Sequence, residues 1–225
     1  MPNGVVNTKI ERPSAEVVER FKELPTSIIS DAMNRSNAMH AEIKCLNSNI
    51  KMVGTAVTVK GMVGCNIMSH KAIYVAEPGD VIVFDARGHT DTSVWGFLQT
   101  KACVLRGITG IVIDGSVRDS LEIRQSGLPV FCRGITPAGP HKGWGDSVNV
   151  PIQCGGVPVS PGDIIVGDDD GVIVVPGGQA TEILKKAEAE MTKEEDWFKK
   201  LDEGQTTLEI LSLDEKIAEM GVKVI

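Results

Sequence analysis

Apolar residues occur along the chain in short runs, and their spacing predicts alternating helices and strands. Residues 14–24 have helical spacing behind a possible Ser14 cap, and residues 51–60 form a Val-rich run typical of a strand. A second short helix, capped by Thr26 or Ser27, is expected to run to Met33. The same reasoning predicts a helix over residues 93–105, a strand over 110–114, a helix over 119–125 and a strand over 128–132. This alternation is typical of β-α-β crossovers and partly parallel strand pairing.

One sequence pattern occurs twice. Pro-Gly-Asp, an aliphatic triplet and a closing Asp occupy residues 78–85 and again residues 161–168. A Pro-Gly turn that leads into a short buried strand explains both copies. We therefore expect two similar strands within one sheet system. The sequence Asp-Asp-Asp-Gly at residues 168–171 lacks the rest of a calcium-binding loop and is interpreted as a turn between strands.

The composition changes after Pro176. Residues 180–200 are rich in Ala, Glu and Lys and predict a long amphipathic helix, and residues 207–220 predict a second one. Such helices would pack on their own domain or reach a neighbouring subunit. We expect an α/β fold in layers with a mixed central sheet over residues 1–176, and residues 177–225 as the C-terminal helical extension of the same domain.

Composition and charge narrow the functional classes. The 225 residues carry 23 Lys and Arg against 30 Asp and Glu, a net charge of -7, which argues against binding nucleic acid by neutralising phosphates. The apolar runs are far shorter than the roughly 20 residues that cross a bilayer, and the N-terminus has no apolar signal region. We expect a cytoplasmic protein with neither nucleic-acid nor membrane partners. Five cysteines without a C-x-x-C pair fit reduced thiols.

The stretch that carries most chemical information is residues 106–119, RGITGIVIDGSVRD. A buried strand over residues 111–113 is expected to run into a turn at 114–116, which leaves Arg118 and Asp119 adjacent at the start of a helix. In open α/β sheets the ligand site lies beyond the carboxyl ends of the strands. An Arg fork suits a carboxylate or enolate oxygen, and an Asp suits a hard divalent cation. A surface pair that caps a helix is the alternative.

The helix expected from about Ser93 also has a chemical interpretation. Its first turn, residues 95–99, follows a polar loop and would expose free amide groups that can hold an oxyanion. The alternative is a buried amphipathic helix in which Gly96 permits close packing.

Two motifs together resemble a known family. They are Arg118-Asp119 in the setting G-x-x-G-x-V-x-D-G-x-x-R-D and residues 161–176, PGDIIVGDDDGVIVVP. The chain resembles the RraA-like family from about Ile10 to its C-terminal helices. It is most similar to the class II pyruvate aldolases of that family, which act on 4-hydroxy-4-methyl-2-oxoglutarate and 4-carboxy-4-hydroxy-2-oxoadipate. The family also contains regulators of ribonuclease E that lack aldolase activity.

The resemblance implies roles for particular residues. Asp119 would bind Mg²⁺ or Mn²⁺, and Arg118 would bind the pyruvyl group of the substrate. The backbone of a four-residue helix start would also bind substrate, and here it consists of Gly96, Phe97, Leu98 and Gln99. An acidic residue from an adjacent subunit would hold metal-bound water. That residue falls at or near Glu194, with Glu195 and Asp196 as alternatives, and a solvated acidic helix face is the competing interpretation.

The chain departs from the family pattern at two positions. Aldolases of the family carry an acid with 20 residues between it and the Arg-Asp pair, and that position is Phe97 here. Loss of this carboxylate would abolish proton transfer in the retro-aldol reaction, alter the substrate, or be compensated by another group. A Gly-Asp-Asn sequence of the oxoadipate branch is Gly64-Cys65-Asn66 here, which removes a second carboxylate near the expected entrance.

The expected activity is a divalent-metal-dependent lyase that cleaves a C–C bond in a small 2-oxo acid and releases pyruvate. The same pyruvate enolate arises when oxaloacetate loses CO₂, and that reaction removes no hydroxyl proton. It therefore tolerates Phe97 better than aldol cleavage does. The alternative is a non-catalytic protein that binds partners in the manner of the ribonuclease E regulators.

Two further expectations concern the assembly of subunits and additional residues that line the cleft. A small subunit with a protruding acidic helix, in a family whose sites lie between subunits, should form a homotrimer or homohexamer. None of the four histidines has zinc-site spacing, although His70 or His89 would be able to line the cleft. Residues 139–145 are expected to form a flexible loop whose Lys142 and Trp144 contact substrate.

Overall fold

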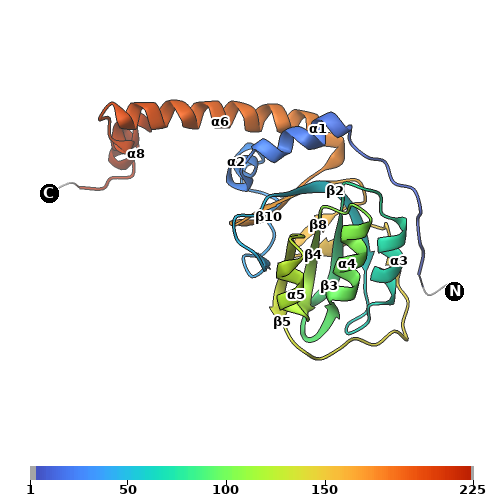
Figure 1. Cartoon of the computed structure of the whole chain (residues 1–225). Helices are drawn as coiled ribbons and strands as arrows, with labels where there is room; N and C mark the ends of the chain where they lie inside the picture. The colour runs from blue at the N-terminus through green and yellow to red at the C-terminus, as the bar shows by residue number, and fades with distance from the viewer. Residues whose placement is uncertain (1–3, 224–225) are drawn as a thin grey trace.

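A mixed β-sheet lies at the centre of the fold (Figure 1). The computed structural model describes residues 4–223. The strands of the sheet are β1 (Lys44–Cys45), β2 (Met52–Lys60), β3 (Asp80–Trp95), β4 (Gly110–Val117), β5 (Val130–Ile135), β6 (Ser147–Val148), β9 (Ile164–Asp168) and β10 (Gly171–Val175). Within the described residues these eight strands pair in the order β1-β5-β4-β3-β2-β9-β10, with β6 beside β2. The predicted α/β class with a mixed central sheet is confirmed.

The middle of the sheet is parallel. Strands β2, β3, β4 and β5 run in the same direction and are connected by α3 (Ile67–Val75), α4 (Phe97–Leu105) and α5 (Ser120–Gln125). These helices bury Ala72, Cys103 and Ile123 in one apolar cluster on a single face of the sheet. The predicted β-α-β crossovers are therefore present. Parallel strands place their carboxyl ends at one edge of the sheet, which is where the ligand sites of such folds are usually found.

The strands that follow the two Pro-Gly-Asp copies both pair with β2. β3 follows the first copy and pairs with β2 in parallel, whereas β9 follows the second copy and pairs with the other edge of β2 antiparallel. Asp80 and Asp163 close equivalent turns, because each carboxylate accepts the backbone N–H three residues earlier, at 2.8 and 2.7 Å. The prediction of two similar strands in one sheet is confirmed, and so is the turn at residues 168–171 between β9 and β10.

Helices from the two ends of the chain cover the β9–β10 side of the sheet. They are α1 (Ala15–Arg20), η1 (Phe21–Glu23), α2 (Thr26–Ala32), η2 (Gly177–Gln179) and α6 (Ala180–Asp202). Ser14 caps α1 as expected, and its hydroxyl accepts the N–H of Val17. The expected cap of α2 by Thr26 or Ser27 is wrong: Pro25 precedes the helix, and the Thr26 hydroxyl donates to Asp168 instead.

The opposite face of the sheet is covered by a hairpin of β7 (Ile152–Cys154) and β8 (Val157–Val159). Its buried side chains pack against residues of the central strands such as Ala56, Val83 and Val112. Val57, the neighbour of Ala56 in β2, faces the helices instead. This alternation places the fold in layers of helices, sheet and hairpin.

Two predicted boundaries next to the Arg118-Asp119 motif are wrong. The helix expected from Ser93 begins at Phe97, since β3 continues to Trp95 by irregular pairing with β4. The turn expected at residues 114–116 is likewise part of β4, and all three residues are buried. The physical reason is tertiary: Ser93 pairs with Ser116 and donates to the carbonyl of Ala138, partners that no local pattern reveals.

The C-terminal end of α6 extends beyond the sheet (Figure 1). The second helix expected over residues 207–220 is divided into α7 (Thr207–Ile210) and α8 (Leu213–Glu219). Ser212 separates them in the left-handed region, with φ 50°. None of the helices in residues 4–223 has the length and apolar content needed to cross a membrane.

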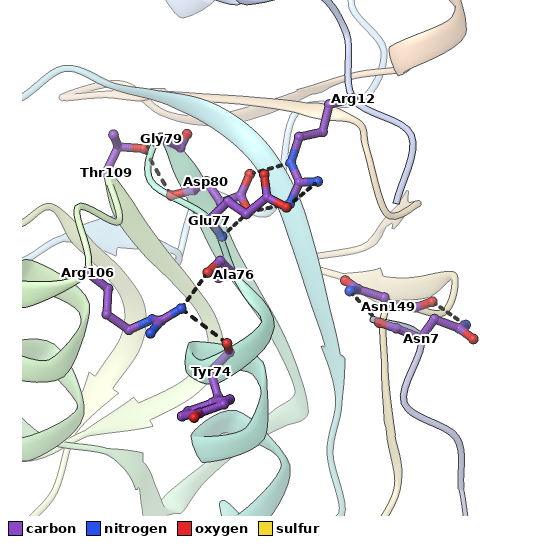
Figure 2. A network of polar contacts seen from close by, with 10 residues as sticks. All are labelled: Asn7, Arg12, Tyr74, Ala76, Glu77, Gly79, Asp80, Arg106, Thr109 and Asn149. Carbon is purple, nitrogen blue, oxygen red and sulfur yellow. Dashed lines mark hydrogen bonds and ion pairs between the residues drawn. The ribbon is translucent and has the colours of Figure 1, made fainter. Parts of the chain in front are cut away.

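An N-terminal strap, residues 4–12, crosses from β6 to the start of β3. Figure 2 shows how it is held: Asn7 and Asn149 exchange side-chain-to-backbone hydrogen bonds of 2.8 Å, and Arg12 forms two bonds to the carboxylate of Asp80. Asp80 is 2% exposed, so the guanidinium supplies the partner that a buried carboxylate requires. Nearby, Arg106 donates to the carbonyl groups of Tyr74 and Ala76.

The five cysteines are free thiols in the described part of the chain, as expected. Burial raises the pKa of Cys103 to about 12 and the pKa of Cys132 to about 11. Thiols with such values carry almost no thiolate at neutral pH and pack as small apolar side chains.

Candidate active site

Arg118 and Asp119 lie at the carboxyl ends of β3 and β4. The backbone N–H of Arg118 donates to the Trp95 carbonyl at 2.9 Å, so the last residues of both strands fix the start of the motif. Asp119 follows as the cap of α5, with φ 55° and ψ 41° in the left-handed region. Asp is one of the few residues that adopts this conformation readily, and such positions are concentrated at functional sites.

The N-terminus of α4 faces the carboxylate of Asp119. The Phe97 N–H donates to Asp119 Oδ2 at 3.0 Å, and Arg118 Nε lies 3.8 Å from the same oxygen. A Cβ on Gly96 would lie only 2.6 Å from Asp119 Oδ2, so glycine is required for this close approach. The helix N-terminus and the guanidinium both place positive charge beside this carboxylate.

These groups border a small pocket of about 80 Å³. Its lining comes from the α3 and α4 N-termini, the ends of β3 and β4, and the 139–145 loop. The lining residues are Asn66, His70, Trp95, Gly96, Leu98, Gln99, Arg118, Asp119, Pro140 and Lys142. The pocket therefore brings together Arg118 and Asp119 with three of the four residues expected at the helix start. The fourth, Phe97, directs its amide to Asp119, and its partly buried side chain packs against the core.

The backbone amides of Leu98 and Gln99 are the next donors in the first turn of α4. Among residues 4–223 neither amide has an acceptor, in contrast to the amide of Phe97. The first amides of a helix have no intrahelical partner and carry partial positive charge. This turn therefore offers two N–H groups to an anion, with Leu98 78% exposed at the mouth of the pocket.

Two basic side chains, Arg118 and Lys142, line the pocket. Arg118 is 47% exposed, and Lys142 approaches from the 139–145 loop. Burial, and then the charge of Lys142, lower the pKa of His70. Among the described residues that line the pocket, Asp119 contributes the one carboxylate, so the pocket suits a small anion.

A buried amide network supports the pocket floor. Asn66 Nδ2 donates to Gln99 Oε1 at 3.2 Å, Gln99 Nε2 donates to Ser69 Oγ at 2.6 Å, and Ser69 Oγ donates to the Asn66 carbonyl at 2.7 Å. The Oδ1 atom of Asn66 has no partner within the described residues, although Asn66 is 4% exposed. Sequence reasoning gave no role to Asn66 or Ser69. An orphaned buried oxygen at a pocket indicates a position for a ligand or water.

The oxygen donors of the pocket fit a hard divalent cation. Asp119 presents a partly exposed carboxylate, and Asn66 Oδ1 is an amide oxygen in the same lining that lacks a partner among residues 4–223. Within that same range no three His, Cys, Asp or Glu side chains are grouped to hold a metal. Mg²⁺ takes oxygen ligands of this kind, with one or two carboxylates and several waters.

The two departures from the family pattern have clear structural counterparts. Phe97 brings no carboxylate to the helix start. Cys65, expected near the entrance, is instead buried outside the pocket lining, and its thiol donates to the Trp144 carbonyl at 3.0 Å. The backbone of Cys65 also forms an isolated parallel β-bridge with His141. Cys65 therefore anchors the 139–145 loop that carries Lys142.

Glu194, Glu195 and Asp196 lie in the C-terminal half of α6, beyond the last residue that packs on the core, Met191, and none lines the pocket of its own chain. Glu194 continues the buried stripe of α6: Ala187 and Met191 pack against the body, and Phe198 and Leu201 follow Glu194 at helical spacing. Phe198 is 55% exposed and Leu201 38% exposed. Glu194 is therefore an acid within an apolar stripe.

The remaining candidates lie elsewhere. His89 pairs with Gly115 inside the sheet, and His40 contacts Arg133. Trp144 is 54% exposed and does not line the pocket. The aspartates of the β9–β10 turn bind the chain itself: Asp168 accepts from Thr26, and Asp169 accepts from the Asn49 N–H.

Comparison with known proteins identifies the family of the chain. Residues 26–174 match the RraA-like family described as Aldolase/RraA. A protein of Halalkalibacterium halodurans, named provisionally as a 4-hydroxy-4-methyl-2-oxoglutarate aldolase, is 42% identical over 180 residues, which is 80% of this chain and 86% of its own. A Thermus thermophilus protein named 4-hydroxy-4-methyl-2-oxoglutarate aldolase is 26% identical over 154 residues, 68% of this chain and 93% of its own.

A solved structure of a protein described as belonging to an RNase inhibitor family is also similar to this chain. Streptomyces coelicolor RraAS2, described as an unusual member of the RNase ES inhibitor RraA protein family, has a TM-score of 0.75 and 28% identity. The match covers 84% of this chain and all of the solved chain. The residues matched by the family model include all of the strands and helices that build the pocket. On this evidence the chain belongs to the RraA-like family.

Proposed function

We propose that this chain is a divalent-metal-dependent lyase that cleaves a C–C bond in a small 2-oxo acid and releases pyruvate. The supporting observation is the arrangement of Arg118 and Asp119 against the first turn of α4 in one anion-compatible pocket. Relatives named 4-hydroxy-4-methyl-2-oxoglutarate aldolase favour that oxo acid as substrate. Oxaloacetate decarboxylation is the second expected reaction, because it passes through the same enolate.

The chain's own residues bind and orient the substrate. Arg118 would hold the keto oxygen and stabilise the negative charge that develops there as the enolate forms. The Leu98 and Gln99 amides would receive a carboxylate oxygen, since they are the unused donors of the helix start within the described residues. Lys142, which lines the same pocket, would bind a second carboxylate. Each of these donors becomes more effective in the transition state, where charge accumulates.

Mg²⁺ or Mn²⁺ would be held by Asp119 together with water. When bound, the metal supplies a positive charge that lowers the energy of the enolate. The Phe97 N–H would keep the carboxylate of Asp119 in its position, because it bonds one oxygen and leaves the other available. Gly96 contributes by leaving room for that contact.

The site would be completed by a neighbouring copy of the chain. Glu194 lies in an apolar stripe whose outer part is exposed on its own subunit, and interfaces bury such stripes. A ring of three or six subunits would bring this acid, or its neighbours Glu195 and Asp196, to the next pocket. The resemblance gives the same role to an acid at this place.

The proposal is tested by pyruvate release from 4-hydroxy-4-methyl-2-oxoglutarate and from oxaloacetate, with Mg²⁺, Mn²⁺ or EDTA. Asp119→Asn should abolish metal-dependent turnover of both substrates, because the amide no longer attracts a divalent cation. Asp169→Asn, at an exposed turn outside the pocket lining, is the matched control and should retain turnover. Unchanged metal-dependent turnover in Asp119→Asn would contradict the proposal.

A non-catalytic regulator is the second candidate function. Phe97 favours it, since it replaces the acid that the aldolases carry, and so does the structural similarity to a described inhibitor of RNase ES. Purified protein that turns over neither substrate but inhibits RNA cleavage by a ribonuclease of the E type would establish this function. Turnover without such inhibition would remove it.

A further inference from the structure

The pocket holds few groups that can exchange a proton. Its titratable lining residues, within the described part of the chain, are His70, Arg118, Asp119 and Lys142. Arginine and lysine side chains ordinarily carry their protons at neutral pH and cannot accept another. Asp119 already accepts the Phe97 N–H and lies beside Arg118. His70 is therefore the lining residue best suited to accept a proton from a bound molecule.

The position of His70 is fixed by the buried amide network. His70 lies on α3, next to Ser69 in sequence. Gln99 donates to the Ser69 hydroxyl at 2.6 Å and accepts from Asn66 at 3.2 Å, which ties the first turn of α3 to the first turn of α4. The helix that carries His70 is thus locked to the helix whose N-terminus faces Asp119. A proton acceptor needs this fixed relation to the reacting atoms.

The surroundings of His70 favour its neutral form. Burial lowers the pKa of His70, and the charge of Lys142 on the facing loop lowers it further. Arg118 and Asp119 face the same pocket from the β4–α5 junction, and Lys71 is the adjacent residue on α3. A neutral imidazole can accept a proton at pH 7, whereas a protonated one cannot.

We propose that His70 is a catalytic base that accepts the proton of the substrate's C4 hydroxyl during aldol cleavage, an inference that rests on the proposed function. The O–H bond breaks and an imidazole N–H bond forms. The C3–C4 bond breaks, its electron pair becomes the C2–C3 double bond, and the C2 carbonyl pair moves onto oxygen to give the pyruvate enolate. The O–H pair becomes the carbonyl of C4, which leaves as a second pyruvate. The enolate then takes the proton back from the imidazolium at C3, which yields the first pyruvate and restores the neutral base.

A base at His70 explains how the site works with Phe97 in place of an acid. An aromatic side chain cannot hold or direct a proton acceptor, and its ring packs partly into the core beside α4. The proton would instead pass to His70 on α3. Decarboxylation of oxaloacetate loses CO₂ without removing a hydroxyl proton, so only aldol cleavage should depend on His70.

The test compares two reactions in the same protein. The values of kcat/KM for 4-hydroxy-4-methyl-2-oxoglutarate cleavage and for oxaloacetate decarboxylation are measured with Mg²⁺ in wild type, His70→Ala and His70→Gln. Loss of a general base typically costs about 10²- to 10⁴-fold. The ratio of cleavage to decarboxylation should therefore fall by about 10²-fold or more in both variants. His89→Gln, a histidine within the sheet, should leave the ratio unchanged.

Two readouts separate a base from a structural role. Added imidazole should restore part of the cleavage rate in His70→Ala but not in His70→Gln, where the cavity is filled. The wild-type pH profile of cleavage should rise through one deprotonation below the ordinary histidine pKa, and His70→Gln should lack that step. Circular dichroism confirms that each variant is folded.

The outcomes are distinguishable. If the wild type turns over neither substrate, the proposed function fails and the role of His70 fails with it. If both reactions proceed and His70→Gln lowers them equally, or lowers neither, the proposed function stands and the catalytic base is elsewhere.

Discussion

Gly96 and Asp119 show how a single missing side chain shapes the pocket. The backbone of Gly96 is extended, with φ -156°, a conformation that any residue adopts, so glycine is not needed for its backbone. It is needed because the Asp119 carboxylate occupies the space of a Cβ. The requirement is therefore about the close approach of two groups rather than about backbone strain.

Replacing Gly96 with alanine should inactivate the site without unfolding the protein. The new methyl group would displace the Asp119 carboxylate, which loses its bond from the Phe97 N–H. We expect kcat/KM for oxaloacetate decarboxylation to fall by about 10²-fold, as for one misplaced catalytic group. Gly143→Ala is the control, since no heavy atom lies within 4 Å of the place that its methyl group would take. Equal activity of the two variants would contradict the role assigned to Gly96.

At the scale of single residues, the sequence predicts the chemistry of the site but not the hydrogen bonds that hold it together. Adjacent Arg118 and Asp119 after a buried strand are visible as a motif, and the structure places them in one pocket. The bonds that join Asn66, Ser69 and Gln99 are not visible, because they link two helices that are separated by a whole strand in sequence. Such pairings depend on how α3 and α4 pack, which no local pattern encodes.

At the scale of elements, the start of α2 depends on the end of β9. Asp168 accepts both the N–H and the hydroxyl of Thr26, at 2.8 and 2.6 Å, and Lys51 lies 3.6 Å away. Burial acts to raise the pKa of Asp168, but the Thr26 hydrogen bonds and the Lys51 charge outweigh it and lower that pKa. The ionised carboxylate thus joins a helix, a strand and a cation.

This junction should make stability depend on pH. A carboxyl group whose pKa is lower in the folded state contributes stability above its unfolded pKa of about 4, and loses it as pH falls through the folded value. We expect the free energy of unfolding of the wild type, measured with urea, to decline below about pH 4. In Asp168→Asn this decline should be smaller, with lower stability at pH 7.

A second variant measures what the Thr26 hydroxyl alone contributes to stability. Thr26→Val keeps the shape of the side chain and the backbone N–H but removes one hydrogen bond to a charged group, at an expected cost of about 1.5–3 kcal/mol at pH 7. The cost should shrink at low pH, where Asp168 is protonated. Thr192→Val, whose hydroxyl bonds only a carbonyl of its own helix, should cost less and show no such pH dependence.

Element boundaries were predictable where local signals act alone. The extents of β2 and α6 follow from a Val-rich run and from a long Ala-, Glu- and Lys-rich segment, and both predictions are within two residues. The predicted start of α4 at Ser93 is wrong, because residues 93–95 belong to β3 and pair with β4. The division between α7 and α8 was missed because Ser212 adopts a left-handed conformation that its residue type does not announce.

At the scale of the whole molecule, the outer half of α6 presents an exposed apolar stripe. Phe198 and Leu201 continue, at helical spacing, the stripe that packs on the core up to Met191, and we expect them to be covered in a ring of subunits. Phe198→Ser should therefore weaken self-association by at least about 10-fold, since a buried aromatic side chain contributes roughly 1.5–3 kcal/mol. Lys199→Ser, on an exposed position beside it, should not.

Sedimentation velocity over a range of protein concentrations measures this effect. If the outer stripe also delivers Glu194 to a neighbouring pocket, dissociation of Phe198→Ser should lower pyruvate release in parallel with the loss of the oligomer. A wild type that sediments as a monomer at every concentration would contradict the expected ring.

The N-terminal strap and helices also bear on how the chain is made. Asn7 binds Asn149, Thr26 binds Asp168, and Arg20 binds Glu188, so these partners are separated by 142, 142 and 168 residues. During synthesis residues 7–26 cannot form these contacts until residues 149–188 have left the ribosome. A segment that is made early thus docks late, onto strands and helices that are made long after it.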